Sequence, residues 1–348
     1  MAKDSHKRSL LGAVFVLIVV AGIAFFAEQY YRFRVCNFVS RDGEEHGFYM
    51  RPGRSVDSLI AIIEQDYEIQ SHLDWRLHVA YMHFTEAKVG YYRLPARIGD
   101  KQLIRIFQKG YQSPIRLSFT NQIRNREQLA GRMGEALLLD SAEVMARLDS
   151  VDYLRQFGLN RATAVCLFIP NTYEVYWTIS PDDLFARMNK EYKAFWTEER
   201  LSKAKSKGLT PVQVATLASI VESETYKAAE HPQIASLYLN RLRKGMPLQA
   251  CPTVIFANGD FSLRRVLKRH LALDSPYNTY KYAGLPPGPI RCAYGRTMDA
   301  VLNAPKTDYL YMCANPDWSG THVFSSTYSQ HAATARAYRQ ELNKRHIQ

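Results

Sequence analysis

An uninterrupted apolar run close to the start of the chain constrains its fold more than any other feature. Residues 10–27 (LLGAVFVLIVVAGIAFFA) contain no charge and no proline, and Arg8 and Glu28 flank them. Eighteen helical residues are just long enough to span a bilayer. A cleaved signal peptide is the alternative, but the run exceeds a typical signal core, and bulky Phe25 and Phe26 close it instead of small residues. We therefore predict a tip at 1–9 and an uncleaved transmembrane helix at 10–27.

The charges around this helix predict its orientation. Three basic residues precede the apolar run and two follow it: Lys3, Lys7 and Arg8, then Arg32 and Arg34. Because cytoplasmic flanks carry the excess of Lys and Arg, this small bias favours a cytoplasmic N-terminus.

The net charge of +12 predicts an acidic partner. Nucleic acid is excluded because the sequence has no helix-turn-helix, no RNA-binding aromatic motif and no basic run of five or more. A membrane surface or an anionic cell-wall polymer fits better. With 348 residues, the chain is long enough for two domains with sizeable cores.

Residues 37–148 read as small mixed α/β units. A turn at 51–55 leads to a predicted helix at 56–65, and a second helix is predicted at 74–86. A strand at 88–94 (KVGYYRL) then precedes a helix at 100–109 that Gly110 ends.

A strong helix signal begins at Thr210. Thr210 and Gln213 form a capping box around Pro211, and apolar residues then recur at helical spacing. Glu222 lies on the flank of that apolar face, where partial desolvation would raise a carboxyl pKa as a general acid requires. A solvated surface glutamate is the plainer interpretation. Glu224, two residues further on, leaves the opposite flank of the helix, so it is not expected to pair with Glu222.

The rest of the second half alternates short elements and loops. We predict a strand at 165–169, a helix at 180–196, a polar link at 201–207, a helix at 232–244 ended by Gly245, a strand at 248–256, strands at 308–314 and 321–326, and a closing helix from 329. Residues 275–290 (SPYNTYKYAGLPPGPI) can hardly be helix or central strand. Three tyrosines beside Asn278 in a rigid loop suit a sugar groove, because tyrosine rings stack on pyranoses and asparagine bonds N-acetyl groups. No zinc, nucleophile-elbow or phosphate-loop motif appears, so neither a metal nor another cofactor is predicted.

The blocks LASIVESET, IASLYLNRLRKGMPLQ, PTVIF, SPYNTYKYAGLPPGPI, KTDYLY and HVFSSTYSQH resemble, in order and spacing, the MltG/YceG-like endolytic murein transglycosylases. The resemblance implies an α+β fold: the transmembrane helix, a LysM-like α/β region at 37–160 and a catalytic domain at 161–348. It implies cleavage of the MurNAc–GlcNAc bond in nascent peptidoglycan strands to leave 1,6-anhydro-MurNAc ends, which terminates strand growth. It also implies a single-pass inner-membrane protein with a periplasmic bulk, with cell-wall synthases as further partners.

The same resemblance suggests roles for individual residues. Glu222 would protonate the leaving oxygen and then, as carboxylate, remove the proton of the muramic acid C6 hydroxyl. Predicted substrate-binding residues are Gln249, Asn278, Tyr280, His322 and Ser325.

One stretch and three single positions depart from the family pattern. Residues 118–122 replace an extended Pro-Glu-Gly turn, and Asn171 replaces an Asp. Cys251 and Cys292 both stand where the family has other residues, Cys251 in place of an Asp, and their joint appearance in an oxidising compartment suggests a disulfide.

Two other functions stay open. A lysozyme-like muramidase would use Glu222 with a second carboxylate, for which Asp260 and Asp274 are candidates. A non-catalytic, membrane-anchored glycan-binding scaffold is the other, and within it the LysM-like region is either a glycan binder or a spacer.

Overall fold

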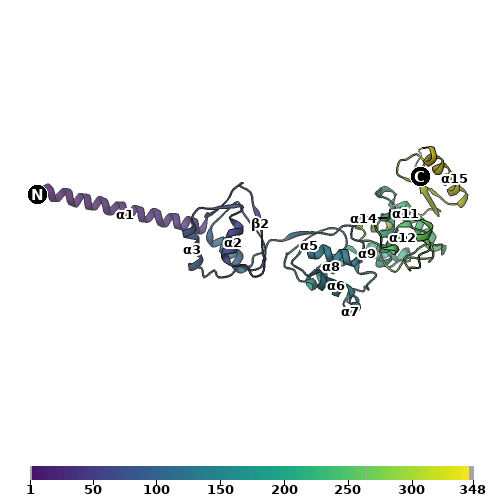
Figure 1. Ribbon diagram of the computed structural model, residues 1–348, viewed down its shortest axis with the longest axis horizontal. Coiled ribbons are helices and arrows are strands. Elements are labelled where there is room, and N and C mark those ends of the chain that lie inside the picture. The colour runs from purple at the N-terminus through teal and green to yellow at the C-terminus, as the bar shows by residue number, and fades with distance from the viewer. Residues whose placement is uncertain (1, 264, 345–348) are drawn as a thin grey trace. The chain divides into compact units, whose positions relative to one another are not determined.

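A computed structural model describes residues 2–263 and 265–344 of the chain (Figure 1). The chain forms two compact units. Unit 1 consists of Met1–Arg116 with Glu174–Thr178, and unit 2 of Leu117–Tyr173 with Ile179–Gln348. The sequence placed a boundary at 160–161, whereas residues 117–160 pack with the second unit. The fold is mixed α/β, as predicted.

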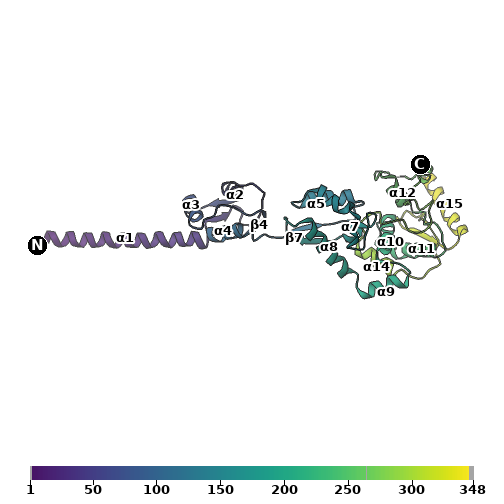
Figure 2. The same ribbon diagram turned by 90° about the horizontal axis from the view of Figure 1, so that it is seen from below.

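Unit 1 begins with one long helix, α1 (Ala2–Arg34), which extends beyond the predicted 10–27 in both directions (Figure 2). Its segment Gly12–Arg34 has 23 residues and contains an 18-residue window with a mean hydropathy of 2.1, so it is long and apolar enough to cross a membrane. The helix then runs directly into the folded part of unit 1. Gln29 and Arg32 both donate hydrogen bonds of 2.6 Å to the carboxylate of Asp74 in α3 (His72–Tyr81).

The rest of unit 1 surrounds an aromatic core. Strand β1 (Phe38–Ser40) pairs antiparallel with β3 (Tyr67–Ile69) and with β5 (Arg97–Ile98), and β2 (His46–Met50) pairs with β4 (Gly90–Leu94). Buried aromatic side chains fill the space between these strands and the helices: Phe38, Tyr67, Trp75, Phe84, Tyr92 and Phe107. Burial of such large apolar rings is the main stabilising term for a unit of this size.

The three predicted helices of unit 1 are confirmed, two of them shorter than predicted and the one at 100–109 with the predicted bounds. Helix α2 (Val56–Ile63) is capped by Ser55, and α4 (Asp100–Lys109) ends at Gly110, whose φ of 72° is the left-handed conformation that glycine adopts without strain. The helix predicted at 74–86 is α3, which ends at Tyr81 because the backbone turns at His83 with a φ of 50°.

The chain passes between the two units within two strands that pair with each other. These are β6 (Ile115–Ser118) and β7 (Thr172–Val175), and a boundary between unit 1 and unit 2 falls inside each of them.

Unit 2 is built around α10 (Pro211–Glu224), which is buried continuously from Val214 to Glu222. The predicted capping box of Thr210 and Gln213 is present. The other elements of unit 2, in chain order, are α5 (Arg126–Ala136), α6 (Ser141–Asp149), α7 (Val151–Arg155), η1 (Ala164–Leu167), α8 (Pro181–Phe195), α9 (Glu198–Ser206), η2 (Ala228–Glu230), α11 (His231–Arg243), α12 (Cys251–Asn258), α13 (Lys268–Leu271), α14 (Gly295–Leu302), β8 (Tyr311–Ala314), β9 (His322–Ser325) and α15 (Tyr328–Lys344). Helices α14, α11, α12 and α9 pack around α10, and Figure 2 shows α10 beside α11 and α14.

Three sequence predictions in unit 2 are wrong. The strand predicted at 165–169 is the 3-10 helix η1, in which Cys166 N donates to Thr163 O and Phe168 N donates to Val165 O. The polar link predicted at 201–207 belongs to α9, whose acidic first turn and basic last turn both complement the helix dipole. The strand predicted at 248–256 is mostly α12, with Pro252 in its first turn, where its missing N–H costs nothing.

The remaining predictions for unit 2 are confirmed. The helix predicted at 180–196 is α8, and the one predicted at 232–244 is α11. Strands β8 and β9 form an antiparallel pair, and residues 275–290 contain neither helix nor strand.

Candidate functional site

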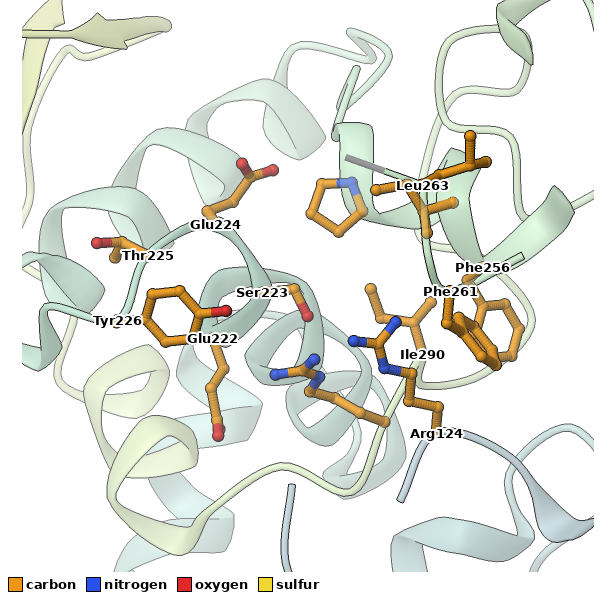
Figure 3. A pocket seen from close by; sticks show the side chains of 13 residues that line it. Arg124, Glu222, Ser223, Glu224, Thr225, Tyr226, Phe256, Phe261, Leu263 and Ile290 are labelled. Carbon is orange, nitrogen blue, oxygen red and sulfur yellow. The ribbon is translucent and has the colours of Figure 1, made fainter. Parts of the chain in front are cut away.

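The last turn of α10 carries two carboxylates that leave the helix on opposite sides, as the sequence predicted (Figure 3). Glu222 is the more enclosed of the two, with only 6% of its surface exposed. Asn121 Nδ2 donates to its Oε1 at 2.6 Å, and the backbone N–H of Tyr294 donates to its Oε2 at 3.0 Å. Both oxygens of Glu222 are therefore bonded to donors within the protein.

Glu224 is in a different environment. It remains partly exposed, and among the described residues it accepts one hydrogen bond, from the Tyr238 hydroxyl to Oε1 at 2.6 Å. Burial raises the pKa of the Glu224 carboxyl above its usual value, and the Tyr238 bond only partly offsets this. The C-terminal end of a helix also disfavours negative charge. Glu224 is thus a reachable carboxyl group that holds its proton to higher pH than an ordinary glutamate.

A pocket of about 330 Å³, called here the Glu224 pocket, opens beside this carboxyl group. Three of the predicted substrate-binding residues line it together with Glu224: Gln249, Tyr280 and His322. The remainder of the wall includes Tyr238, Arg241, Cys251 and residues of β8. The structure thus brings three of the predicted binding residues to one pocket, and the predicted acid, Glu222, does not line it.

Asn278 and Ser325 do not belong to this pocket. Asn278 has no exposed surface; its amide donates to the carbonyl oxygens of Leu271 and Leu273, and its oxygen accepts from the N–H of Tyr280. Asn278 therefore shapes the 275–290 loop instead of facing a ligand. Ser325 is 6% exposed in β9. Neither side chain lines the Glu224 pocket, because both are enclosed by protein.

Gln249 is held in place by its backbone and by Arg241. Its φ of 54° lies in the left-handed region, which a non-glycine residue adopts only when its surroundings enforce it. Arg241 Nη1 donates to Gln249 Oε1 at 3.2 Å and to Leu248 O at 2.9 Å, while the Gln249 N–H donates to Thr279 O. Such an arrangement fixes a side-chain amide toward the Glu224 pocket at some cost in backbone strain.

His322 is positioned by a carboxylate that the sequence analysis missed. Glu230 Oε1 accepts the backbone N–H of His322 at 2.6 Å, and Glu230 Oε2 lies 3.1 Å from His322 Nδ1. Thr225 Oγ1 donates to the same Oε2. Because Glu230 and His322 lie 92 residues apart, no local pattern could have indicated this pair.

The predicted disulfide between Cys251 and Cys292 does not form, and all five cysteines are free. Cys292 is 2% exposed, and its Sγ donates to Val165 O within the interior of unit 2. Cys251 is exposed, with its Sγ 3.2 Å from the Tyr280 hydroxyl. The two thiols therefore face different surroundings.

A second pocket, of about 270 Å³, lies at the same end of α10 and is called here the arginine pocket. Both glutamates line it, with Arg124 and Arg291 and an apolar wall that includes Phe256 and Phe261. Figure 3 shows the Arg124 side chain extending into this pocket. The end of α10 thus contributes to two adjoining pockets.

The fold and this site together define a class of protein. A model of the YceG-like family matches residues 48–337, so the chain belongs to the YceG-like family. A crystal structure of a YceG-like protein from Listeria monocytogenes is similar, with a TM-score of 0.56 and 28% identity over 83% of this chain and 98% of that one.

Curated relatives carry a more specific name. The endolytic murein transglycosylase of Bacillus subtilis (strain 168) is 29% identical over 311 residues, which are 84% of each chain. The endolytic murein transglycosylase of Streptococcus pneumoniae serotype 2 (strain D39) is 27% identical over 298 residues, 76% of this chain and 53% of that protein.

Proposed function

We propose that this protein is a membrane-anchored endolytic lytic transglycosylase that cleaves the MurNAc–GlcNAc bond of peptidoglycan strands. The name of its relatives and its membership of the YceG-like family support this activity. The observation that carries the proposal is the partly exposed Glu224, with its raised pKa, beside Gln249, Tyr280 and His322.

The reaction needs one group that donates and then accepts a proton. Protonated Glu224 gives its proton to the glycosidic oxygen as the C1–O4 bond breaks, so that N-acetylglucosamine leaves with a free C4 hydroxyl. The muramic acid C6 hydroxyl then attacks C1, and the Glu224 carboxylate takes the hydroxyl proton. A C1–O6 bond replaces C1–O4, no water enters, and Glu224 ends protonated as it began.

The polar residues around Glu224 have distinct parts in this scheme. The fixed amide oxygen of Gln249 and the ring of Tyr280 face the cavity in which the sugar would lie. Oriented dipoles of this kind stabilise the oxocarbenium-like charge at C1 without having to reorganise. Glu230 acts through His322 as a positioning residue.

We favour Glu224 over Glu222 as the acid for two reasons. Glu222 is almost wholly enclosed, and each of its two oxygens already accepts a hydrogen bond from the protein. Glu224 keeps one oxygen free of protein donors among the described residues and is reachable from the pocket. We assign Glu222 the role of joining α10 to the 118–122 turn and to Tyr294.

Mass analysis of the products from uncrosslinked glycan strands tests the activity and the assignment together. The full-length, detergent-solubilised protein should give anhydro-muramyl ends. Glu224→Gln should lower kcat by at least about 100-fold, the usual contribution of a general acid. Glu222→Gln, the matched control two residues earlier on the opposite side of the helix, should keep most of the activity. The reverse order would return the role to Glu222.

A muramidase would give products heavier by one water. Neither Asp260 nor Asp274 lines the two pockets at the end of α10, and each is exposed and bonded to its own loop. Nothing in these contacts favours the hydrolytic alternative, and the same mass measurement decides it.

The membrane-related predictions are part of the proposal. Helix α1 would anchor the protein in the inner membrane, with the bulk of the chain periplasmic and near the cell-wall synthases. A protease added to intact spheroplasts should then digest the chain up to α1. The LysM-like interpretation of the region 37–160 rests on the sequence pattern alone. Retention of uncrosslinked strands by an inactive Glu224→Gln protein, lost when unit 1 surface tyrosines such as Tyr49 and Tyr91 are changed, would support glycan binding there.

A further inference from the structure

The arginine pocket brings two positively charged side chains together. Arg124 and Arg291 both line it, and within the described part of the chain neither forms an ion pair. Arg200 of the same unit, by contrast, forms an ion pair with Asp299 at 2.7 Å. Two unpaired guanidiniums in one recess are costly unless an anion joins them.

Arg291 shows this imbalance most clearly. Its Nε is enclosed and has no hydrogen-bond partner among the described residues. Burial lowers the pKa of Arg291, and the like charge of Arg124 lowers it further. Buried donors without partners are rare in folded proteins and mark places where a ligand or ion completes the structure.

The carboxylates nearby do not meet this need. Glu222 faces Arg291, but its oxygens are already bonded by Asn121 and Tyr294. Glu224 must be protonated, and so neutral, when it acts as the acid. In the reactive state the recess therefore has an excess of positive charge.

The shape of the recess indicates what kind of anion would fit. Part of its wall is apolar and includes Pro252, Ile255 and Phe261, and the Arg124 guanidinium lies over the Phe261 ring, 4.6 Å from the ring centre. This stacking holds the guanidinium plane while leaving its edge free for a bidentate contact. A short chain that carries both a carboxylate and aliphatic carbons suits such a recess better than a bare inorganic ion.

We propose that the arginine pocket is a carboxylate subsite, in which Arg124 and Arg291 hold an acidic group of the peptide stem attached to the muramic acid at the cleaved bond. This inference rests on the proposed function for the identity of the substrate. Glu224 lines both pockets, so a sugar at the Glu224 pocket and its stem in the arginine pocket would meet at the acid. The subsite would select strands whose stems carry a free carboxylate.

Kinetics with three uncrosslinked strands test this subsite. The strands carry stems with a free carboxylate on the second residue, stems with that group amidated, or no stems, which leaves only the lactyl carboxylate. The full-length protein should cleave the first strand with a kcat/KM about tenfold above the second, mainly through KM, as expected for one charge-assisted bidentate contact. A preference for stem-free strands would identify the lactyl group as the carboxylate that is held.

Variants assign the preference to the two arginines. Arg291→Gln and Arg124→Gln should each bring the ratio between free and amidated stems close to one, and Arg291→Lys should retain part of it. Lys244→Gln removes one positive charge from an exposed position outside the pocket and should leave the ratio unchanged. An unchanged ratio in both arginine variants, or an equal loss in Lys244→Gln, would overturn the proposal.

A binding measurement separates this inference from the proposed activity. Calorimetric titration of the full-length Glu224→Gln protein with a soluble muramyl peptide should give a Kd that weakens about tenfold when the stem is amidated. If no strand is cleaved by the unmodified protein but this carboxylate-dependent binding persists, the activity fails and the subsite stands. Equal binding of free and amidated stems sinks the subsite even if cleavage is normal.

Discussion

The Tyr238 hydroxyl donates a 2.6 Å hydrogen bond to Oε1 of Glu224, linking the middle of α11 to the last residue of α10. Two opposed effects meet at this contact. Burial raises the pKa of Glu224, and the Tyr238 bond lowers it by stabilising the ionised form. The pair therefore tunes the carboxyl group between the protonated and ionised forms that the proposed reaction needs in turn.

Tyr238→Phe should move the pH dependence of cleavage. Loss of the hydroxyl removes the interaction that favours the carboxylate, so the pKa of Glu224 should rise and the alkaline limb of kcat/KM should shift to higher pH. The rate should fall by roughly tenfold because the carboxyl group loses its orientation. Tyr153→Phe is the matched control, since it removes a tyrosine–carboxylate bond, to Asp182, away from both pockets. A shift to lower pH would contradict the assignment.

Glu224→Gln should stabilise the protein at neutral pH. Because the pKa of Glu224 is raised in the folded state, the folded protein binds this proton more tightly than the unfolded chain does. Its stability therefore falls as pH rises from the unfolded pKa to the folded one, by about 1.4 kcal/mol for each unit of difference. Glutamine does not titrate and can still accept the Tyr238 bond. The Tm of the variant should match the unmodified protein near pH 4 and exceed it near pH 7; a gap that is constant with pH would count against a raised pKa.

Gly288→Ala should destabilise unit 2. A Cβ at Gly288 would overlap the carbonyl oxygen of Ala162, which is backbone and cannot move aside cheaply. We expect a loss of about 1–3 kcal/mol in the free energy of unfolding by chemical denaturation. Gly131→Ala is the control, because α5 offers open space there and alanine favours helix by about 1 kcal/mol. Equal effects of the two changes would mean that the 275–290 loop does not press on Ala162.

Thiol labelling tests the correction at the cysteines. With N-ethylmaleimide at pH 8, the exposed Cys251 should react first in the folded protein, while Cys166 and Cys292 should react only after unfolding. Burial raises the pKa of both enclosed thiols, for Cys166 to about 12, which slows them further. Modification of Cys251 should also reduce cleavage, since it adds bulk beside Tyr280. Detection of a reduction-sensitive, cross-linked peptide pair that contains Cys251 and Cys292 would instead support the predicted disulfide.

Local signals in the sequence were sufficient for the helix that carries the site. The capping box at Thr210 and the apolar spacing after it predicted α10, and the spacing of Glu222 and Glu224 predicted that they leave opposite flanks. The choice between them could not be made locally. Which flank meets a ligand depends on Tyr238, Tyr280 and His322, and these reach the site from elements up to about 100 residues further along the chain.

The choice between helix and strand for short apolar runs was the other step that the sequence could not decide. Residues 248–256 satisfy a strand pattern as well as a helical one, and only Pro252 in the first turn and Gly259 at the end mark the helix. The prediction for Asn278 met a similar ambiguity, because an amide that can bond an N-acetyl group can equally stabilise a turn. In the structure the Asn278 amide donates to two backbone carbonyls.

Helix α1 connects the apolar run to the rest of unit 1 without an intervening linker. It continues unbroken to Arg34, and both Gln29 and Arg32 bond Asp74. Helix α1 and the rest of unit 1 are therefore joined directly by a continuous helix and by side-chain hydrogen bonds. In the membrane-anchored arrangement proposed above, each residue inserted into α1 would move the rest of unit 1 by about 1.5 Å along the helix axis and turn it by about 100°, so the length of this one helix would set both the height and the facing direction of that part.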